Sequence, residues 1–241
     1  MTFKKTLKYI LFLLLIGSLG FLYSFSSIRN SSKIVKEIVV EFERGENSFL
    51  THSMVNKMLI QNNISVKNQA KSVIDLYRLE KTVSINPYVE STSVFLTITG
   101  TLKTVIKQRT PIMRIVKNNG SYYIDKQGFV VPLSDNYSAR VMLVSGIKNQ
   151  VQVKEILPFI NFILEDDFLH KEVVGIEKLD NNDYQISVRS GNYKIDFGEL
   201  TKIDEKFKKL KAFYNKAFKD KTIQDYKTIN LKYHNQVVCA K

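Results

Sequence analysis

The chain has 241 residues, enough for one or two compact domains and too few for a long multidomain assembly. Its 44% hydrophobic and 24% charged residues, with only 10 Gly and 4 Pro, exclude the disordered and fibrous classes, and its single cysteine, Cys239, excludes an internal disulfide. The formal net charge of +13 allows nucleic acid, anionic lipid or an acidic protein as a partner and does not choose among them.

The amino-terminal segment predicts a membrane anchor. From Tyr9 to Ile28 the chain carries no charge over 20 residues, and a helix of that length spans about 30 Å, close to the hydrocarbon thickness of a bilayer. Lys4, Lys5 and Lys8 precede this segment, and the positive-inside bias therefore predicts a short cytoplasmic tail over residues 1–8. The remainder is expected outside the cytoplasmic membrane, in a periplasm or another extracytoplasmic space.

A cleaved signal peptide is the competing interpretation of the same segment. Ser24-Phe25-Ser26 offers small residues at the spacing that a signal peptidase prefers. The apolar run is nevertheless longer than the usual ~7–15 residues of a signal peptide, and we therefore favour an uncleaved anchor. Residues 156–164 form the next most apolar stretch, and they are too few to span a membrane. The sequence thus predicts a single-pass protein.

Residues 29–111 are expected to form a first, small domain. A β-branched and apolar segment over residues 34–42 predicts its first strand. Thr51 or Ser53 is positioned to cap a following helix, whose apolar stripe ends near Asn62-Asn63.

The first domain continues with a second helix and a hairpin. The helix is predicted from Ile74 to Val83, and Asn86-Pro87 ends it because the residue before a proline is pushed out of the helical region. Alternating residues over 88–107 predict two strands that turn near Thr99-Gly100-Thr101. The expected order of elements is β-α-α-β-β.

Residues 112–241 are expected to form a second, β-rich domain. Strands are predicted over four short apolar segments and one longer alternating meander: residues 112–116, 122–124, 129–132, 141–144 and 174–197. The Asn119-Gly120 pair between the first two segments favours a hairpin. A helix is predicted from Val151 to Leu164, with Pro158 kinking it or shifting its start.

A lysine-rich helix is predicted from Ile203 to Phe218, after capping-box spacing from Thr201 to Asp204. From residue 200 onward, eleven Lys minus four acidic residues give a net charge of +7. Such a face could contact DNA or anionic lipid, but the expected topology separates it from the chromosome, and a solvated charged face is the commoner explanation. We expect no nucleic-acid partner.

The residue pattern predicts no enzyme, metal site, cofactor or small-molecule substrate. His52, His170 and His234 each lack a second histidine at metal-binding spacing, and no nucleotide-binding glycine motif or hydrolase elbow occurs. Two carboxylate pairs are interpreted as solvated acids at a helix end and a hairpin tip: Asp166-Asp167, and Asp180 with Asp183. We therefore expect no catalytic residues.

The last predicted element is a half-buried strand from Tyr226 to Val238. A strand at the end of a chain can leave one edge of a sheet unpaired, and such an edge is either protected or used to add a strand from a partner. Lys227, Lys232 and His234 interrupt its apolar residues. On periodicity alone, the interpretation as an ordinary edge protected by its lysines has the same weight as the interpretation as a partner-binding edge.

Five short motifs follow one another along the chain: Asn86-Pro87-Tyr88-Val89 with Val94, Thr101-Leu102-Lys103 with Lys107-Gln108-Arg109-Thr110-Pro111, Tyr123-Ile124-Asp125 with Gly128, Val144-Ser145-Gly146, and Ile229-Asn230-Leu231-Lys232-Tyr233. In order and spacing they resemble the bacterial cell-division protein family FtsQ/DivIB, over nearly the whole chain. The sequence departs from the family at Tyr88, where many relatives have Trp, and at Asn230, where Asp is usual. It also lacks the family's common glycine turn at His234-Asn235-Gln236.

The resemblance implies an α+β fold with one transmembrane helix, a POTRA (polypeptide-transport-associated) domain and a β-rich domain. It implies a non-enzymatic scaffold of the divisome that acts in septum formation. In that family the last strand binds FtsB, which forms a complex with FtsL, by strand addition. The partner-binding positions that the resemblance carries over are Asn230, Leu231, Lys232 and Tyr233, with flanking Thr228 and Ile229. Lys227 is added to them because Lys227 and Lys232 could steer an acidic partner segment.

Two functions of other classes stay open at this point. The alternative is a POTRA-bearing chaperone or transport component that guides polypeptides at a membrane, although the chain contains a single unit of this kind. An exported enzyme would need a clustered polar pocket, which the residues do not supply.

Overall fold

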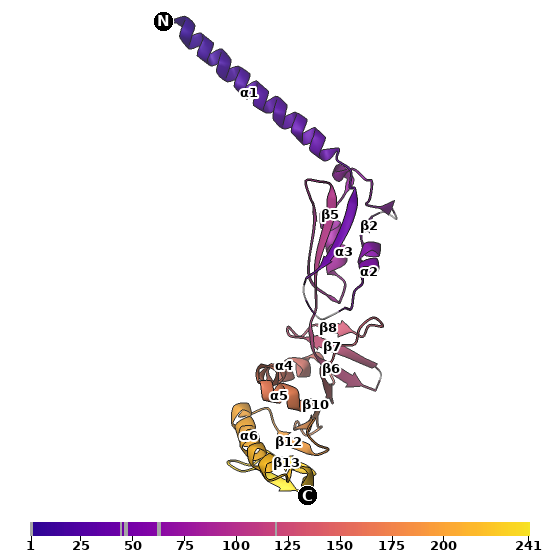
Figure 1. The fold of residues 1–241 in the computed structure, drawn as a ribbon, viewed down its shortest axis with the longest axis vertical. Coiled ribbons are helices and arrows are strands. Elements are labelled where there is room, and N and C mark those ends of the chain that lie inside the picture. The colour runs from indigo at the N-terminus through magenta and orange to yellow at the C-terminus, as the bar shows by residue number, and fades with distance from the viewer. Residues whose placement is uncertain (1, 44, 46–47, 62–63, 119) are drawn as a thin grey trace. The chain divides into compact units, whose positions relative to one another are not determined.

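The computed structural model describes residues 2–43, 45, 48–61, 64–118 and 120–241 (Figure 1). The chain divides into two compact units, residues 1–108 and 109–241, and each unit has its own buried apolar core. An amino-terminal apolar helix precedes a mixed set of helices and strands, and the second unit is rich in strands. The expected α+β fold class is therefore confirmed.

The first helix, α1 (Thr2–Ser31), is long and apolar enough to cross a membrane. Its portion Leu7–Ser31 has the length and composition of a span, and it contains the segment predicted from the sequence. All residues from Leu7 to Asn30 are exposed, so nothing in the described chain covers these apolar side chains. A continuous apolar surface of this length is stable in lipid and costly in water.

A three-stranded sheet forms the centre of the first unit. Its strands, in spatial order, are β1 (Glu37–Phe42), β5 (Thr101–Gln108) and β4 (Val89–Leu96). β1 is parallel to β5, and β4 is antiparallel to β5. The helices α2 (His52–Met58) and α3 (Leu76–Ser84) contribute Val55, Leu79 and Val83 to the core that this sheet shares with them. Apart from two short strands between the helices, the β-α-α-β-β order therefore matches the expectation.

Polar caps fix where both helices of the first unit begin. Thr51 Oγ1 accepts a hydrogen bond from Met54 N at 3.3 Å, which selects Thr51 over Ser53 as the cap of α2. Asp75 Oδ1 accepts one from Arg78 N at 2.9 Å and caps α3. Each cap satisfies a backbone N–H that has no partner within its helix.

The first of these helices is shorter than the sequence predicted. It ends at Met58, and two short strands, β2 (Ile60–Gln61) and β3 (Ile64–Ser65), pair directly after it. The predicted end at Asn62-Asn63 lies outside the described residues. The prediction of a helix through Ile60 was wrong, because that β-branched residue pairs with Ser65 in an extended conformation. A 3-10 turn, η1 (Lys71–Val73), leads on to α3.

A nine-stranded sheet dominates the second unit. Its spatial order is β14-β13-β12-β11-β10-β9-β6-β7-β8. The strands, in chain order, are β6 (Pro111–Lys117), β7 (Gly120–Asp125), β8 (Val130–Pro132), β9 (Met142–Ser145), β10 (Val173–Lys178), β11 (Tyr184–Val188), β12 (Lys194–Gly198), β13 (Thr228–Asn230) and β14 (Val238–Ala240). β9 is parallel to both β6 and β10, β12 is parallel to β13, and the other neighbours are antiparallel. The predicted β6–β7 hairpin is confirmed.

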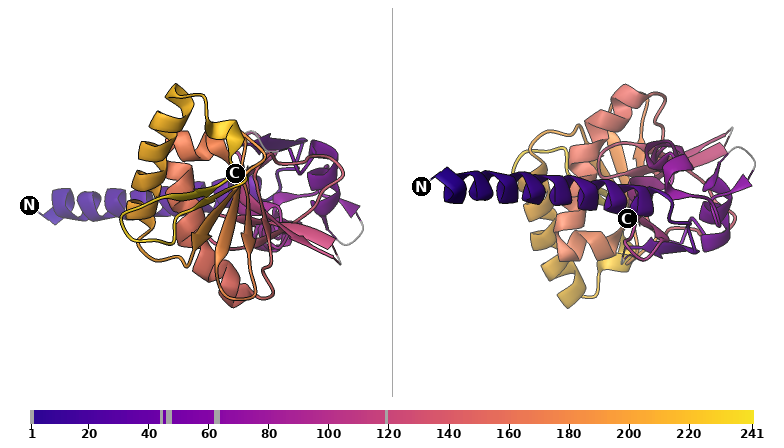
Figure 2. Two further views of the ribbon diagram at one scale, coloured as in Figure 1. Left: turned by 90° about the horizontal axis from the view of Figure 1, so that it is seen from below. Right: turned by 90° about the horizontal axis from the view of Figure 1, so that it is seen from above.

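Helices cover one face of this sheet (Figure 2). They are α4 (Gln150–Glu165), α5 (Asp167–Glu172) and α6 (Ile203–Lys219), and a 3-10 turn, η2 (Ile223–Asp225), follows them. Phe159 of α4 lies 5.7 Å from Phe207 of α6 and 4.8 Å from Phe197 of β12, measured between ring centroids. Leu143 of β9, which is 50% exposed, points to the other face.

The two long helices begin at or within one residue of the predicted positions, Ile203 for α6 and Val151 for α4, but the residues that cap them were not predicted correctly. α4 begins after Asn149, whose Oδ1 accepts a hydrogen bond from Gln152 N at 3.0 Å, and it continues through Pro158 without a delayed start. α6 begins after Lys202, which adopts φ 50° and makes no side-chain cap. The capping box predicted at Thr201 was wrong, because the left-handed Lys202 occupies the cap position instead.

The predicted terminal strand is two strands. β13 ends at Asn230, whose Oδ1 accepts a hydrogen bond from Lys232 N at 2.9 Å, and the chain then turns back at Asn235 with φ 58°. β14 returns antiparallel to β13, while β12 pairs with its other side. The hypothesis of one terminal strand from Tyr226 to Val238 with an unpaired edge was wrong, because Asn235 tolerates the left-handed conformation that a reversal needs, and β13 is paired on both sides. At this end of the sheet the edge strand is β14, and β8 is the edge strand at the other end.

Candidate partner-binding edge

The edge strand β14 is short and partly apolar. Val238 is 42% exposed, Ala240 is exposed, and Cys239 is half-buried against the core, where burial raises the pKa of its thiol. One side of β14 pairs with β13, and within the described chain no strand pairs with its other side. An edge with unpaired backbone groups is a template for one more strand.

The seven positions predicted to bind a partner separate into a buried, an intermediate and an exposed group, and Thr228 and Asn230 form the intermediate group. Ile229 and Leu231 are fully buried, and Leu231 N donates to Asp196 O at 2.9 Å. Lys227, Lys232 and Tyr233 are exposed. The buried residues fix the position of β13, and the exposed residues are the ones available on the surface.

The loop from β13 to β14 is attached to α6 and to the β10–β11 turn. Lys209 Nζ donates to Tyr233 O at 2.6 Å and to Leu231 O at 3.3 Å. Lys232 Nζ donates to Asp183 Oδ2 at 2.6 Å. This hydrogen bond holds the pKa of Asp183 below its usual value and raises the pKa of Lys232. Tyr233 is therefore held through its backbone, with 50% of its surface exposed.

A pocket of about 550 Å³ lies beside this loop and is predominantly cationic. Five lysines and three acidic residues line it: Lys202, Lys206, Lys208, Lys209, Lys232, Asp183, Glu199 and Glu205. Lys206 is buried, which lowers its pKa, and its Nζ donates to Glu199 O at 2.7 Å and lies 4.6 Å from the centroid of the Phe197 ring. Gly198, with φ 75°, permits the close approach of the Lys232 side chain, since a Cβ there would lie 2.9 Å from Lys232 Cγ.

The carboxylates that drew attention in the sequence have structural partners. Asp166 caps α5 by accepting hydrogen bonds from Phe168 N and Leu169 N, and Lys211 Nζ also donates to it. The hydrogen bond from Lys211 lowers the pKa of Asp166. Asp180 pairs with Lys148 on the surface. No three His, Cys, Asp or Glu side chains within the described ranges are grouped in a way that could hold a metal ion.

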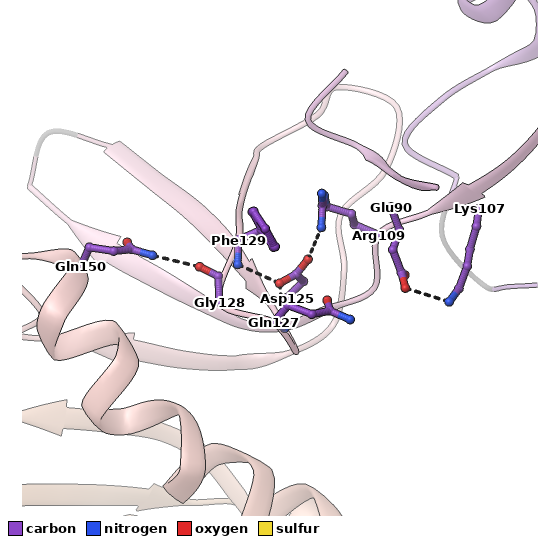
Figure 3. Close-up of polar contacts among 8 residues, drawn as sticks. All are labelled: Glu90, Lys107, Arg109, Asp125, Gln127, Gly128, Phe129 and Gln150. Carbon is purple, nitrogen blue, oxygen red and sulfur yellow. Dashed lines mark hydrogen bonds and ion pairs between the residues drawn. The ribbon is translucent and has the colours of Figure 1, made fainter. Parts of the chain in front are cut away.

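A buried ion pair at the start of the second unit was not predicted (Figure 3). Arg109 Nη1 donates to Asp125 Oδ2 at 2.7 Å, and the guanidinium lies 4.4 Å from the centroid of the Phe129 ring. Asp125 is 1% exposed, and its Oδ1 accepts from Gln127 N at 3.0 Å and from Phe129 N at 2.8 Å. The charge is thus compensated on both oxygens. The only sequence signal was that Arg109 and Asp125 both belong to the motifs noted above.

A second polar feature that was not predicted from the sequence is a buried cluster around Glu172. Its carboxylate accepts from the Ser190 hydroxyl, which is also 2.7 Å from Tyr193 Oη. Tyr193 Oη donates to Tyr214 Oη at 2.8 Å, and burial is the main cause that raises the pKa of Tyr214. The cluster joins α5, the β11–β12 turn and α6, and it accounts for the polar groups buried there.

A family comparison bears on this second unit. Residues 110–240 match the family model described as FtsQ/DivIB, C-terminal related, which covers more than half of the chain. The chain belongs to the FtsQ/DivIB family. No curated protein matches it significantly. This FtsQ/DivIB chain is therefore a cell-division membrane protein from a family of non-enzymatic division scaffolds, and its apolar α1 fits a single membrane anchor.

Removal of the buried carboxylate at the Arg109 pair is expected to destabilise the second unit. Asp125→Ala leaves Arg109 without its partner and two backbone N–H groups without an acceptor, and we expect a loss of about 3–5 kcal/mol. The free energy of unfolding, followed by circular dichroism in urea, measures this. The matched control is Asp180→Ala, whose side chain is 94% exposed and paired with Lys148; about 0–1 kcal/mol is expected there. Equal effects in the two variants would contradict a special role for Asp125.

The Asp183–Lys232 pair predicts a small pH dependence. The pKa of Asp183 is lowered in the folded chain, so its contribution is complete above the unfolded value of about 3.9 and is lost as the pH falls through the folded value. The raised pKa of Lys232 gives the opposite behaviour, with loss at pH above about 10.4. In the curve of unfolding free energy against pH, Asp183→Asn should reduce the loss of stability at both acidic and alkaline pH, by about 1 kcal/mol or less. Identical curves for variant and parent would rule out the pair as a source of stability.

Proposed function

We propose that this FtsQ/DivIB chain is a non-enzymatic, single-pass scaffold of the divisome that captures partners of FtsB and FtsL type by strand addition at β14. The observation that carries the proposal is the unpaired outer side of β14 in a chain of this family. Main-chain hydrogen bonds give attachment in this mode of recognition, and side-chain contacts give specificity.

The surface around β14 suits an acidic partner segment. Lys227, Lys232 and Lys241 flank the edge, and Tyr233 and Val238 expose apolar surface beside them. Lysines at the rim steer an acidic segment toward the edge, while an exposed aromatic ring offers packing area. In this proposal Lys227, Lys232 and Tyr233 contact the partner, and Thr228, Ile229, Asn230 and Leu231 hold the edge from behind.

The proposed topology keeps residues 1–8 in the cytoplasm and sends both folded units across the membrane. Lys4, Lys5 and Lys8 favour this orientation through the positive-inside bias. The first unit, with its β-α-α-β-β order and its β1-β5-β4 sheet, is proposed to be a POTRA-like domain. Both units would then face an extracytoplasmic space.

Proline at successive positions of β14 tests strand addition. Along an edge strand, backbone N–H groups point alternately toward β13 and outward, and proline removes one N–H at each position. Among Val238→Pro, Cys239→Pro and Ala240→Pro, a variant that loses an outward N–H should lose co-purification of the FtsB-type partner and keep its thermal unfolding temperature. A variant that loses an inward N–H should unfold at lower temperature.

Matched side-chain variants complete that test. Tyr233→Ala is expected to weaken partner capture at least tenfold, which corresponds to about 1.4 kcal/mol. Tyr77→Ala, at a tyrosine that is 75% exposed in the first unit, is the control and should leave capture unchanged. Undiminished capture in all three proline variants and in Tyr233→Ala would refute strand addition at β14.

Depletion in living cells tests the division role itself. If the chain is a divisome scaffold, its loss should give filaments without septa, and restoring the parent chain should restore division. Cells that keep normal septa after depletion would instead favour the transport or chaperone alternative. Microscopy of cell length and septum frequency gives the measurement.

A further inference from the structure

Three segments meet where the chain leaves α1, and together they form a surface that we call the collar, defined as residues 31–36, 67–73 and 97–100. Backbone contacts join the segments: Lys71 N donates to Lys33 O at 2.8 Å, and Lys36 N donates to Gly100 O at 2.9 Å. Ile34 also forms a bridge with Ala70. The collar is therefore part of the folded first unit and is not a free linker.

The collar lies next to the membrane if α1 spans it, and the inference rests on the proposed function in this respect. Lys33 is two residues beyond Ser31, the last residue of α1. Two residues of chain reach at most about 7 Å, whatever the direction in which the helix leaves. The uncharged segment that ends at Ile28 fills the hydrocarbon, so the collar is at the depth of the lipid headgroups.

The charges of the collar have one sign. Lys33, Lys36, Lys67 and Lys71 lie in its three segments, and the segments contain no Asp or Glu. Lys33, Lys36 and Lys67 are exposed, and Lys71 is partly exposed. A cluster of lysines at the end of a membrane span is attracted to a surface of anionic lipid.

Exposed apolar side chains accompany these lysines. Ile98, at the tip of the β4–β5 turn, is 87% exposed, and Val73 and Ile34 are 64% and 48% exposed. Lys33 Nζ donates to Ile98 O at 3.2 Å, which holds the tip against the segment that follows α1. Gly100, with φ 91°, lets the turn come close, since a Cβ there would lie 2.8 Å from Ile34 O. Ile98 is thus held in place with its side chain uncovered.

From this combination we propose that the collar is a membrane-contact surface. Ile98 inserts into the lipid interface beside the exit of α1, and the lysines of the collar bind the phosphates of anionic lipids. The pattern of lysines around apolar side chains is that of interfacial membrane binding, which combines burial of apolar area with electrostatic attraction. The consequence is that the first unit is held at the membrane surface and not only tethered to it.

Site-specific fluorescence in vesicles tests the collar. The full chain carrying Cys239→Ser receives either Ile98→Cys or Ile85→Cys, each labelled with an environment-sensitive dye and reconstituted in phosphatidylcholine with or without phosphatidylglycerol. Ile85 is the matched control because it is 72% exposed and lies in the connection that enters β4, whereas Ile98 follows the end of that strand. We expect a blue shift, and quenching by headgroup-labelled lipid, for the dye at position 98 only. Equal spectra at the two positions would overturn the proposal.

Charge variants separate the role of the lysines. Lys36→Glu with Lys67→Glu, at two exposed lysines of the collar, should reduce the blue shift in vesicles that contain phosphatidylglycerol and leave it unchanged in pure phosphatidylcholine. High salt should act in the same way, because the Debye length falls from about 10 Å at 0.1 M to about 3 Å at 1 M. A blue shift independent of lipid charge, salt and these substitutions would overturn the lysine contacts.

Flotation distinguishes the failure of this inference from the failure of the anchor. If the chain stays with the vesicles in a density gradient after carbonate washing, α1 is an anchor, and the dye at position 98 then decides the collar alone. If carbonate releases the full-length chain, the proposed anchor fails and the collar fails with it.

Discussion

The pairing of β13 with β14 is the interaction on which the proposed partner edge depends. Ile229 and Leu231 are fully buried, which fixes β13 within the sheet and leaves the outer position to another strand. Because the chain turns back at Asn235, β14 takes that outer position and presents its own unpaired side. In the proposed strand addition, a partner strand would therefore meet a segment that begins at Val238. The motif at residues 229–233 acts mainly as its support.

Much of the fold could be predicted because its signals are local. An Asn-Gly pair favoured the β6–β7 hairpin, period-two alternation favoured the strands from β10 to β12, and a helical stripe favoured α6. The reversal at Asn235 could not be found in this way. It has no glycine or proline, and the residues on either side of it continue the alternation of a single strand.

The candidate site could be predicted only in part, because only some of its features leave a local signal in the sequence. Alternation correctly separates exposed residues such as Lys232 from buried ones such as Ile229, and it carries no information about which strand is outermost. Long-range polar contacts were also out of reach. Arg109 and Asp125 are separated by a full β6–β7 hairpin, and only folding brings their charges to 2.7 Å. A buried pair of this kind is decided by tertiary packing, which a local pattern does not record.

The two surfaces proposed for binding are built in the same way. Single exposed apolar side chains are ordinary on proteins, so exposure alone does not distinguish Ile98 or Tyr233. In each case, however, a lysine ammonium donates to the residue's own carbonyl: Lys33 to Ile98 at 3.2 Å, and Lys209 to Tyr233 at 2.6 Å. The hydrogen bond restrains the backbone and leaves the side chain uncovered. Less conformational entropy is then lost when lipid or a partner strand covers that side chain, and this favours binding at these two positions over other exposed apolar residues.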